Sequence, residues 1–185
     1  MQTALLLIDV QESFPQRPYW SQSGADVFLE HVNALVDGAR ARGIPIVRVF
    51  HTDGPATPAN PFAHGSEFVR PLTGLVPFEA ALTIEKHRHS ALVGTPLGQW
   101  LTGNGIRRVI VAGIRTEQCC ETTTRHASDE GWAVDFVGDA TLTFDMTTPS
   151  GRTLTAAEIR ERTETVLVDR FATLATVEQA LARAV

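Results

Sequence analysis

The chain has 185 residues, of which 43% are hydrophobic and 20% are charged, and its formal net charge is −5. This composition is typical of a soluble domain with a sizeable core, and the acidic balance gives no reason to expect nucleic acid or a membrane as a partner. The two cysteines are adjacent, so they form no disulfide framework. The N-terminus lacks the features of a signal peptide, and no apolar run is long enough to cross a bilayer. We therefore expect a reduced, cytoplasmic protein with a single domain over residues 1–185.

The first half of the chain alternates between predicted strands and helices. Residues 3–9 are apolar without alternation, which is typical of a central strand covered on both faces. Residues 26–42 carry apolar side chains at helical spacing, and residues 44–50 form the next predicted strand. This order predicts a right-handed crossover between parallel neighbours. Residues 51–77 are rich in glycine and proline and predict a long loop that shapes a pocket.

The second half repeats the pattern. A short strand is predicted over residues 81–86, and Thr155 and Glu158 have the spacing of a capping box at the start of a helix. The remaining predicted strands cover residues 109–112, 131–137 and 171–175, and the remaining predicted helices cover residues 95–101, about 116–129 and 176–184. Six strands alternating with helices predict an α/β fold, a doubly wound three-layer sandwich with a six-stranded, mostly parallel sheet.

Cys119 follows the strand at residues 109–112, after a predicted turn at Gly113. A cysteine at the N-terminus of a helix is easily made reactive, because the free amides and the helix dipole favour the thiolate and can also hold an oxyanion. Neighbours on a helix point about 100° apart, so we expect Cys119 to face the cleft and Cys120 to pack into the core. The alternatives are that Cys119 is only a small buried hydrophobic residue, or that the cysteine pair has a redox role.

Asp9 and Lys86 also lie at the carboxyl ends of predicted strands, where open α/β sheets place their ligands. Asp9 alone is as easily a loop anchor as a catalytic group, and a single lysine is usually a surface residue. Together with Cys119 at the same sheet edge, they form a candidate site in which the lysine stabilises negative charge. The loop after Asp9 carries aromatic side chains; Tyr19 is more simply explained as core packing.

Three segments carry a resemblance to a known family. They are Leu7 to Phe14 (LIDVQESF), Glu85 to Thr95 (EKHRHSALVGT) and Gly113 to Ala127 (GIRTEQCCETTTRHA), with support from Asp139 and Ala140. In these segments and their order, the sequence resembles the isochorismatase-like cysteine hydrolases. That group includes nicotinamidases, N-carbamoylsarcosine amidases, ureidoacrylate amidohydrolases and biuret hydrolases. The motifs are specific for the family and do not identify the substrate.

The resemblance implies a catalytic triad of Asp9, Lys86 and Cys119. It also implies a cis peptide bond before Arg115 and an oxyanion hole made by the backbone amides of Arg115 and Cys119. The expected reaction is hydrolysis of a C–N bond in a small amide, carbamoyl or ureido substrate through a thioester, with no cofactor. Members of the family are usually homo-oligomers, so we expect a dimer or a tetramer.

The sequence departs from the metal-binding nicotinamidases after the second predicted strand. Those enzymes carry an Asp-x-His pair and a further histidine, whereas this chain reads Phe50-His-Thr-Asp-Gly54. His51, Asp53 and His64 leave open a metal site of another arrangement, but loop polar groups are the simpler interpretation, and we expect no metal.

Phe14, Trp20 and Arg115 are the candidate substrate-binding residues. Arg115 either faces the pocket and favours a substrate carboxylate or points outward at the entry to the helix. Two other functions remain as alternatives. An isochorismatase-type vinyl-ether hydrolase does not depend on Cys119, and a non-catalytic redox protein does not need Asp9 and Lys86 at their strand ends.

Overall fold

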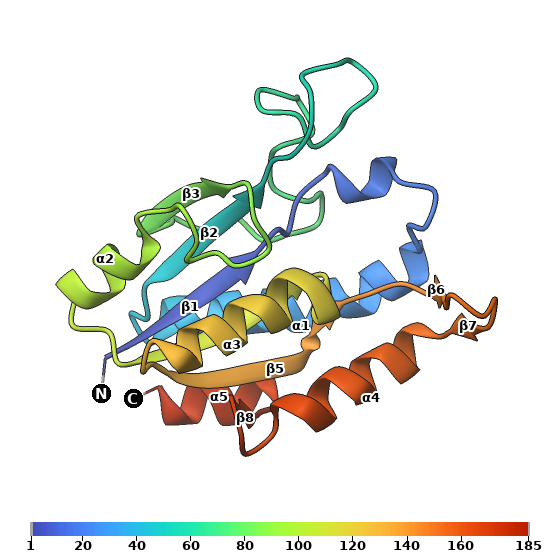
Figure 1. Ribbon diagram of the computed structural model, residues 1–185. Helices are drawn as coiled ribbons and strands as arrows, with labels where there is room; N and C mark the ends of the chain where they lie inside the picture. The colour runs from blue at the N-terminus through green and yellow to red at the C-terminus, as the bar shows by residue number, and fades with distance from the viewer. Residues whose placement is uncertain (1, 185) are drawn as a thin grey trace.

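The computed structural model describes residues 2–184 and contains a six-stranded sheet with helices on both faces (Figure 1). The strand order is β3-β2-β1-β4-β5-β8, and every neighbouring pair is parallel. This arrangement confirms the predicted α/β fold. The strands are β1 (Thr3–Ile8), β2 (Ile46–His51), β3 (Leu82–Lys86), β4 (Arg108–Ile114), β5 (Ala133–Leu142) and β8 (Thr173–Leu174).

The helices divide the core into two halves, one on each face of the sheet. One half packs α1 and α5 against alternate residues of β1, among them Leu5 and Leu7, and the other packs α2, α3 and the end of α4 against Leu6 and Ile8. The helices are α1 (Gln22–Ala41), α2 (Leu97–Gly103), α3 (Glu121–Asp129), α4 (Ala156–Leu167) and α5 (Val177–Arg183), with short turns at η1 (Phe14–Gln16) and η2 (Thr116–Cys120). Among residues 2–184, no helix is long and apolar enough to span a bilayer.

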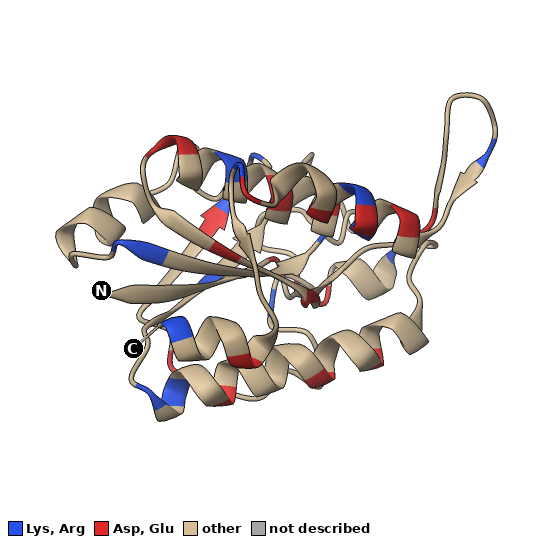
Figure 2. Cartoon of the chain, turned by 90° about the horizontal axis from the view of Figure 1, so that it is seen from below, with Lys and Arg blue, Asp and Glu red and all other residues tan. Residues whose placement is uncertain are grey.

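The central strands are apolar on both faces because helices cover both. All six residues of β1 are buried, which explains why its sequence shows no alternation. Figure 2 shows that charged residues lie mostly in the helices and loops and are few in the strands. The predicted capping box is present at α4, where Thr155 and Glu158 satisfy each other's backbone amides.

The backbones of β1 and β4 approach each other closely near the carboxyl edge of the sheet. Gly113 has a φ of 135°, and a Cβ atom there would lie 1.9 Å from the carbonyl oxygen of Ile8. Only glycine fits both conditions. The predicted turn at Gly113 is therefore wrong: β4 continues to Ile114, and the chain turns at Arg115 instead.

Two segments project beyond this edge of the sheet (Figure 1). One is a two-stranded antiparallel hairpin of β6 (Met146–Thr147) and β7 (Thr153–Leu154), which the sequence analysis did not predict. The other is the predicted loop, here residues 52–81, a fully described segment with no helix or strand longer than the single bridge between Gln11 and Pro71. Asn60 braces it internally, since its Nδ2 atom donates to the carbonyl oxygens of Asp53 at 2.7 Å and Pro55 at 3.1 Å.

Candidate active site

The sheet edge brings together the three side chains that the sequence selected. Asp9 directly follows β1, Lys86 ends β3, and Cys119 lies in the turn after β4. The Nζ atom of Lys86 lies 2.8 Å from Oδ2 of Asp9 and 3.2 Å from Sγ of Cys119. Asp9 adopts a φ of 53°, a left-handed conformation that aspartate tolerates better than most residues. Strands that are far apart in the sequence therefore place an acid, a cation and a thiol in contact.

Burial dominates the electrostatics of this group. Asp9 and Lys86 have no exposed surface, and Cys119 is 6% exposed. Burial raises the pKa of the Cys119 thiol well above its usual range, and the Asp9 carboxylate raises it further, while Lys86 offsets only part of this rise. Apart from the contacts with Lys86 and Cys119, the Asp9 oxygens have no hydrogen-bond partner among the described residues.

Burial therefore favours the neutral thiol of Cys119, whereas the helix N-terminus expected from the sequence would favour the thiolate. Cys119 was expected at the N-terminus of a regular helix. The structure places it in η2, a single π-helical turn that precedes α3, where its side chain is buried. Cys120 has no exposed surface and packs in the core, as predicted. The two cysteines are not bonded to each other.

The protonation state of Cys119 gives a pH prediction. We expect the ultraviolet absorbance of its thiolate to be missing at pH 8 and to rise only in strongly alkaline solution, because burial favours the neutral thiol. The measurement is the absorbance difference between wild type and Cys119→Ala during a pH titration. A plateau reached below pH 7 would instead indicate an ion pair between thiolate and lysine at rest.

The side chain of Lys86 also contacts His51. Burial alone would lower the pKa of Lys86, but the Asp9 carboxylate and Cys119 raise it above its ordinary value, so the ammonium persists. Burial and the Lys86 charge lower the pKa of His51, whose Nδ1 atom lies 3.1 Å from Nζ. His51 is therefore neutral at pH 7, and Nδ1 accepts the hydrogen bond. Gln11 fixes the His51 backbone, accepting from its N–H at 2.7 Å and donating to its carbonyl at 3.0 Å.

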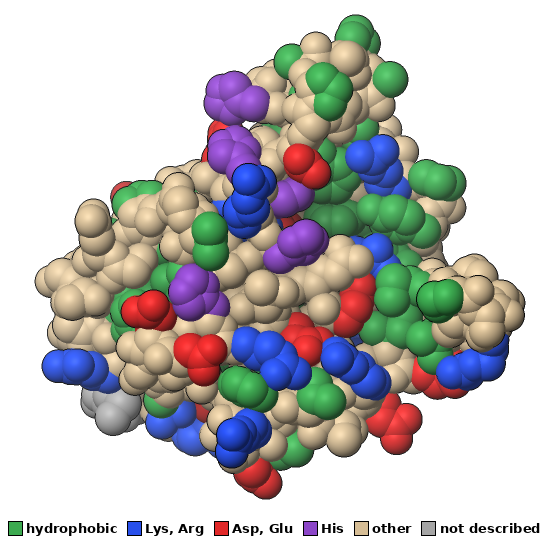
Figure 3. Space-filling model, viewed as in Figure 1, with side chains coloured by type: hydrophobic (Ala, Val, Ile, Leu, Met, Phe, Trp, Pro, Cys, Tyr) green, Lys and Arg blue, Asp and Glu red, His purple; other side chains and the backbone are tan. Residues whose placement is uncertain are grey.

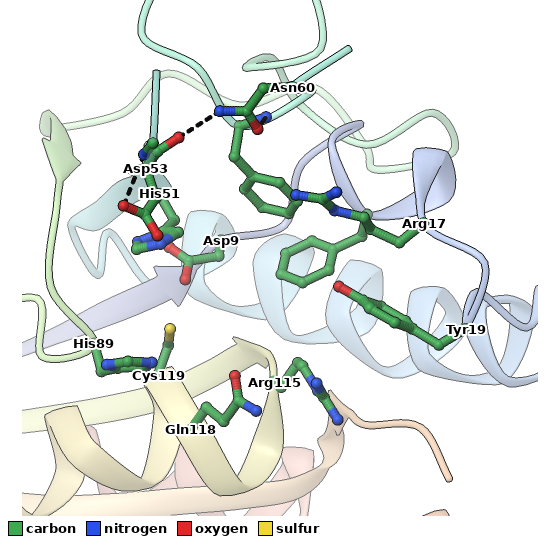
Figure 4. Close-up of a pocket in the computed structure, with 13 residues that line it drawn as sticks. Asp9, Arg17, Tyr19, His51, Asp53, Asn60, His89, Arg115, Gln118 and Cys119 are labelled. Carbon is green, nitrogen blue, oxygen red and sulfur yellow. Dashed lines mark hydrogen bonds between the residues drawn. The ribbon is translucent and has the colours of Figure 1, made fainter. Parts of the chain in front are cut away.

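A pocket of about 410 Å³ opens over Asp9 and Cys119. Figure 3 shows histidine side chains gathered beside this hollow and hydrophobic side chains on its other side. Figure 4 shows the labelled side chains converging on it from the loop after β1, from the end of β2 and the segment that follows it, from the segment after β3 and from the turn after β4. Its lining consists of Asp9, Phe14, Arg17, Tyr19, His51, Asp53, Gly54, Asn60, Phe62, His89, Arg115, Gln118 and Cys119.

The aromatic predictions hold only in part. Phe14 lines the pocket, whereas Trp20 does not: its ring packs 5.7 Å from that of Phe144, against the core half formed by α1 and α5. Trp20 therefore does not line the pocket, in contrast to the prediction, and its Nε1–H group donates to Oε1 of Gln22, the first residue of α1, at 3.2 Å. Tyr19, expected to serve packing, lines the pocket as well as packing 4.9 Å from Phe144. The sequence thus indicated the correct loop, but of the two adjacent aromatic residues it is Tyr19, and not Trp20, that lines the pocket.

Arg115 faces the pocket, which settles the orientation that the sequence left open. Its Nε atom lies 3.1 Å from Oε1 of Glu117, and its guanidinium lies 5.2 Å from the ring of Tyr19. The peptide bond between Ile114 and Arg115 is cis, as the resemblance implied. The charge of Arg115 is thus already balanced by a neighbour on its own turn.

The three residues weighed as a metal site do not gather. His64 pairs with Glu85 at 2.9 Å on an exposed surface, while His51 and Asp53 line the pocket. His51 Nδ1 already faces the Lys86 ammonium, and Asp53 Oδ1 accepts from the Gly54 amide at 2.7 Å. Within residues 2–184, no three His, Cys, Asp or Glu side chains form a group able to hold a metal ion. These donors do not fit the metal-ligand set of the nicotinamidases, so the reaction proposed for this protein uses no metal ion.

Comparisons with known proteins agree with the fold. A family model described as the isochorismatase domain matches residues 3–179. The chain belongs to the isochorismatase family. YrdC, an uncharacterized family protein of Bacillus subtilis, is 29% identical over 95% of this chain and 92% of its own length. A crystal structure of an isochorismatase-family hydrolase from Chromobacterium violaceum matches with a TM-score of 0.87 and 28% identity, over 99% of this chain and 93% of that one.

Two curated relatives of this isochorismatase-family hydrolase are named for their reactions. Nicotinamidase 3 of Arabidopsis thaliana is 31% identical over 77% of this chain and 74% of its own length. Ureidoacrylate amidohydrolase RutB of Klebsiella pneumoniae is 26% identical over 74% of this chain and 70% of its own. Both names denote enzymes that hydrolyse C–N bonds.

Sequence reasoning missed Phe62 and four polar side chains that line this pocket. The polar ones are Arg17, Asn60, His89 and Gln118. Two of them had a signal, because His89 lies within the segment that carries Lys86, and Gln118 directly precedes Cys119. Arg17 and Asn60 lie in irregular loops, where periodicity gives no information about direction.

Proposed function

We propose that this chain hydrolyses a C–N bond of a small amide, carbamoyl or ureido substrate, with Cys119 as nucleophile and a thioester as intermediate. One observation carries the proposal: a buried thiol, carboxylate and ammonium lie in contact at the floor of a pocket. The names of the relatives support C–N bonds as the target. Cys120 has no exposed surface, which gives no support to a redox role for the pair.

The first half of the reaction transfers an acyl group to sulfur. As Sγ of Cys119 attacks the substrate carbonyl, its proton passes to the carboxylate of Asp9, so a thiolate need not exist at rest. The carbonyl oxygen becomes an oxyanion, for which the backbone amides of Arg115 and Cys119 are the proposed donors. When this intermediate collapses, the C–N bond breaks, and the leaving nitrogen takes the proton back from Asp9.

The second half releases the acid. Asp9, again a carboxylate, accepts a proton from a water molecule that attacks the thioester carbonyl. The new tetrahedral intermediate expels sulfur, which recovers its proton from Asp9, and a carboxylic acid or carbamate leaves. Lys86 holds Asp9 at 2.8 Å and donates to Sγ at 3.2 Å, so it stabilises negative charge on whichever partner carries it.

The test is ammonia release from a panel of small amides, carbamoyl compounds and ureides. For each compound that turns over, an acid-quenched sample is examined by intact-protein mass spectrometry. We expect an adduct with the mass of the acyl group on Cys119 for the substrates whose thioester hydrolyses slowly. An acyl adduct on another residue, with none on Cys119, would contradict this route.

A further inference from the structure

The positive charges around the pocket are not equivalent. Lys86 pairs with Asp9 at 2.8 Å, and Arg115 pairs with Glu117 at 3.1 Å. Arg17, the other cation in the lining, forms no ion pair and donates no side-chain hydrogen bond to any residue between 2 and 184. An arginine has five N–H donors and remains charged at any ordinary pH, so this group is an unused receptor for an anion.

Arg17 is held in place by a ring, not by a carboxylate. Its guanidinium lies 5.1 Å from the centroid of Phe62, and Phe62 packs edge-on against Phe14 with centroids 5.0 Å apart. Both rings are at least nine-tenths buried, so the platform under the guanidinium is fixed. A cation–π contact orients the guanidinium but leaves its N–H groups unpaired. Preorganisation of this kind favours a planar, bidentate partner such as a carboxylate.

The charges on the two sides of the pocket differ in sign. Figure 4 shows Arg17 on one side and Asp53 on the other, with the Cys119 sulfur below them. Asp53 is exposed and caps its own loop through the Gly54 amide. A substrate that carries a negative charge would therefore be attracted toward Arg17 and repelled from the side of Asp53.

We propose that Arg17 binds a carboxylate of the substrate and so selects small amides or carbamoyl compounds that also carry an acid group. This inference rests on the proposed function and replaces Arg115, whose charge Glu117 balances, as the residue that recognises the anion. A pocket of about 410 Å³ holds a linear monoamide of a dicarboxylic acid.

The experiment compares matched substrates that differ only in charge. Ammonia release is measured for succinamate and glutaramate and for their neutral methyl esters, with wild type, Arg17→Gln and Arg107→Gln. Arg107 is exposed and lies at the opposite edge of the sheet, where its amide bonds to the Gln2 carbonyl, so it controls for the lost charge. We expect Arg17→Gln to lower kcat/KM for the acids about 10- to 100-fold, mainly through KM, and to change the esters less than about threefold.

Equal losses for acids and esters in Arg17→Gln would overturn the inference, as would a wild-type preference for the esters. If neither these compounds nor the wider panel releases ammonia, the proposed function fails separately, and the anion site is then decided by calorimetry with succinate and glutarate. Binding by wild type and Arg107→Gln that weakens at least about tenfold in Arg17→Gln supports the site. Equal binding by all three proteins, or no binding, overturns it.

Discussion

Replacing Cys119 by alanine is expected to lower kcat for ammonia release by about 10⁴-fold or more, to the background of the assay. Without its nucleophile the proposed covalent mechanism cannot form the thioester, because no other side chain that lines the pocket is a thiol. The measurement is steady-state ammonia release from the best substrate of the panel, at a fixed enzyme concentration. A residual rate above about 1% of wild type would remove Cys119 as the nucleophile.

The adjacent cysteine supplies the matched control. Cys120→Ala deletes the same atom one residue away, from a side chain that is fully buried behind the site. We expect this variant to lose some stability through the small cavity left in the core and to keep kcat within about threefold of wild type. If both substitutions abolish turnover equally, the effect is a collapse of the turn at residues 116–120 and not the loss of a nucleophile.

Replacing Lys86 by methionine is expected to abolish turnover and to lower the free energy of unfolding by about 3–5 kcal/mol at pH 7. The substitution keeps an unbranched side chain but leaves the Asp9 carboxylate charged, unpaired and without exposed surface. Because the pKa of Lys86 is raised, this contribution is complete below its unfolded pKa of about 10.4 and is lost as the pH rises through the folded value. Urea denaturation followed by circular dichroism measures the change.

Two further variants interpret that result. Arg40→Met breaks the ion pair with Asp37, in which both side chains are more than half exposed, and is expected to change stability by less than about 1 kcal/mol. The double variant Asp9→Asn with Lys86→Met removes both buried charges and should recover part of the loss. If Lys86→Met is no more destabilising than Arg40→Met, Asp9 and Lys86 do not form a charged pair in the folded protein.

The sheet and the position of the candidate site were predictable from local patterns. Residues 3–9 are apolar without alternation, as expected for a central strand, because helices cover both faces of the sheet. The strand order then determines which strand ends lie next to each other. Parallel strands deliver their carboxyl ends to one edge, so Asp9, Lys86 and Cys119 were expected together, and the structure places them in contact. That prediction needed no knowledge of side-chain packing.

The details that govern reactivity were not predictable in the same way. The state of the Cys119 thiol depends on how deeply the π-helical turn is buried, and burial is a property of the whole fold. The roles of Arg17 and Arg115 depend on which of them has a carboxylate within reach, and only Arg115 has Glu117 beside it. Trp20 and Tyr19 are neighbours in the sequence, but only Tyr19 lines the pocket, while Trp20 packs against the core. These properties depend on contacts between residues in the folded protein, and the periodicity of the sequence does not predict such contacts.

The projecting segment at residues 52–81 shapes one side of the pocket and contributes none of the three candidate catalytic side chains. Asp53, Asn60 and Phe62 form a wall of the pocket, and the tip of the segment is braced by internal hydrogen bonds, such as those of Asn60 to the Asp53 and Pro55 carbonyls. The candidate catalytic side chains Asp9, Lys86 and Cys119 lie at or just after the ends of strands in the core. Substitutions in this segment can therefore change which substrates fit the pocket without altering the candidate catalytic side chains. A directed-evolution library that aims at substrate range would diversify this segment first.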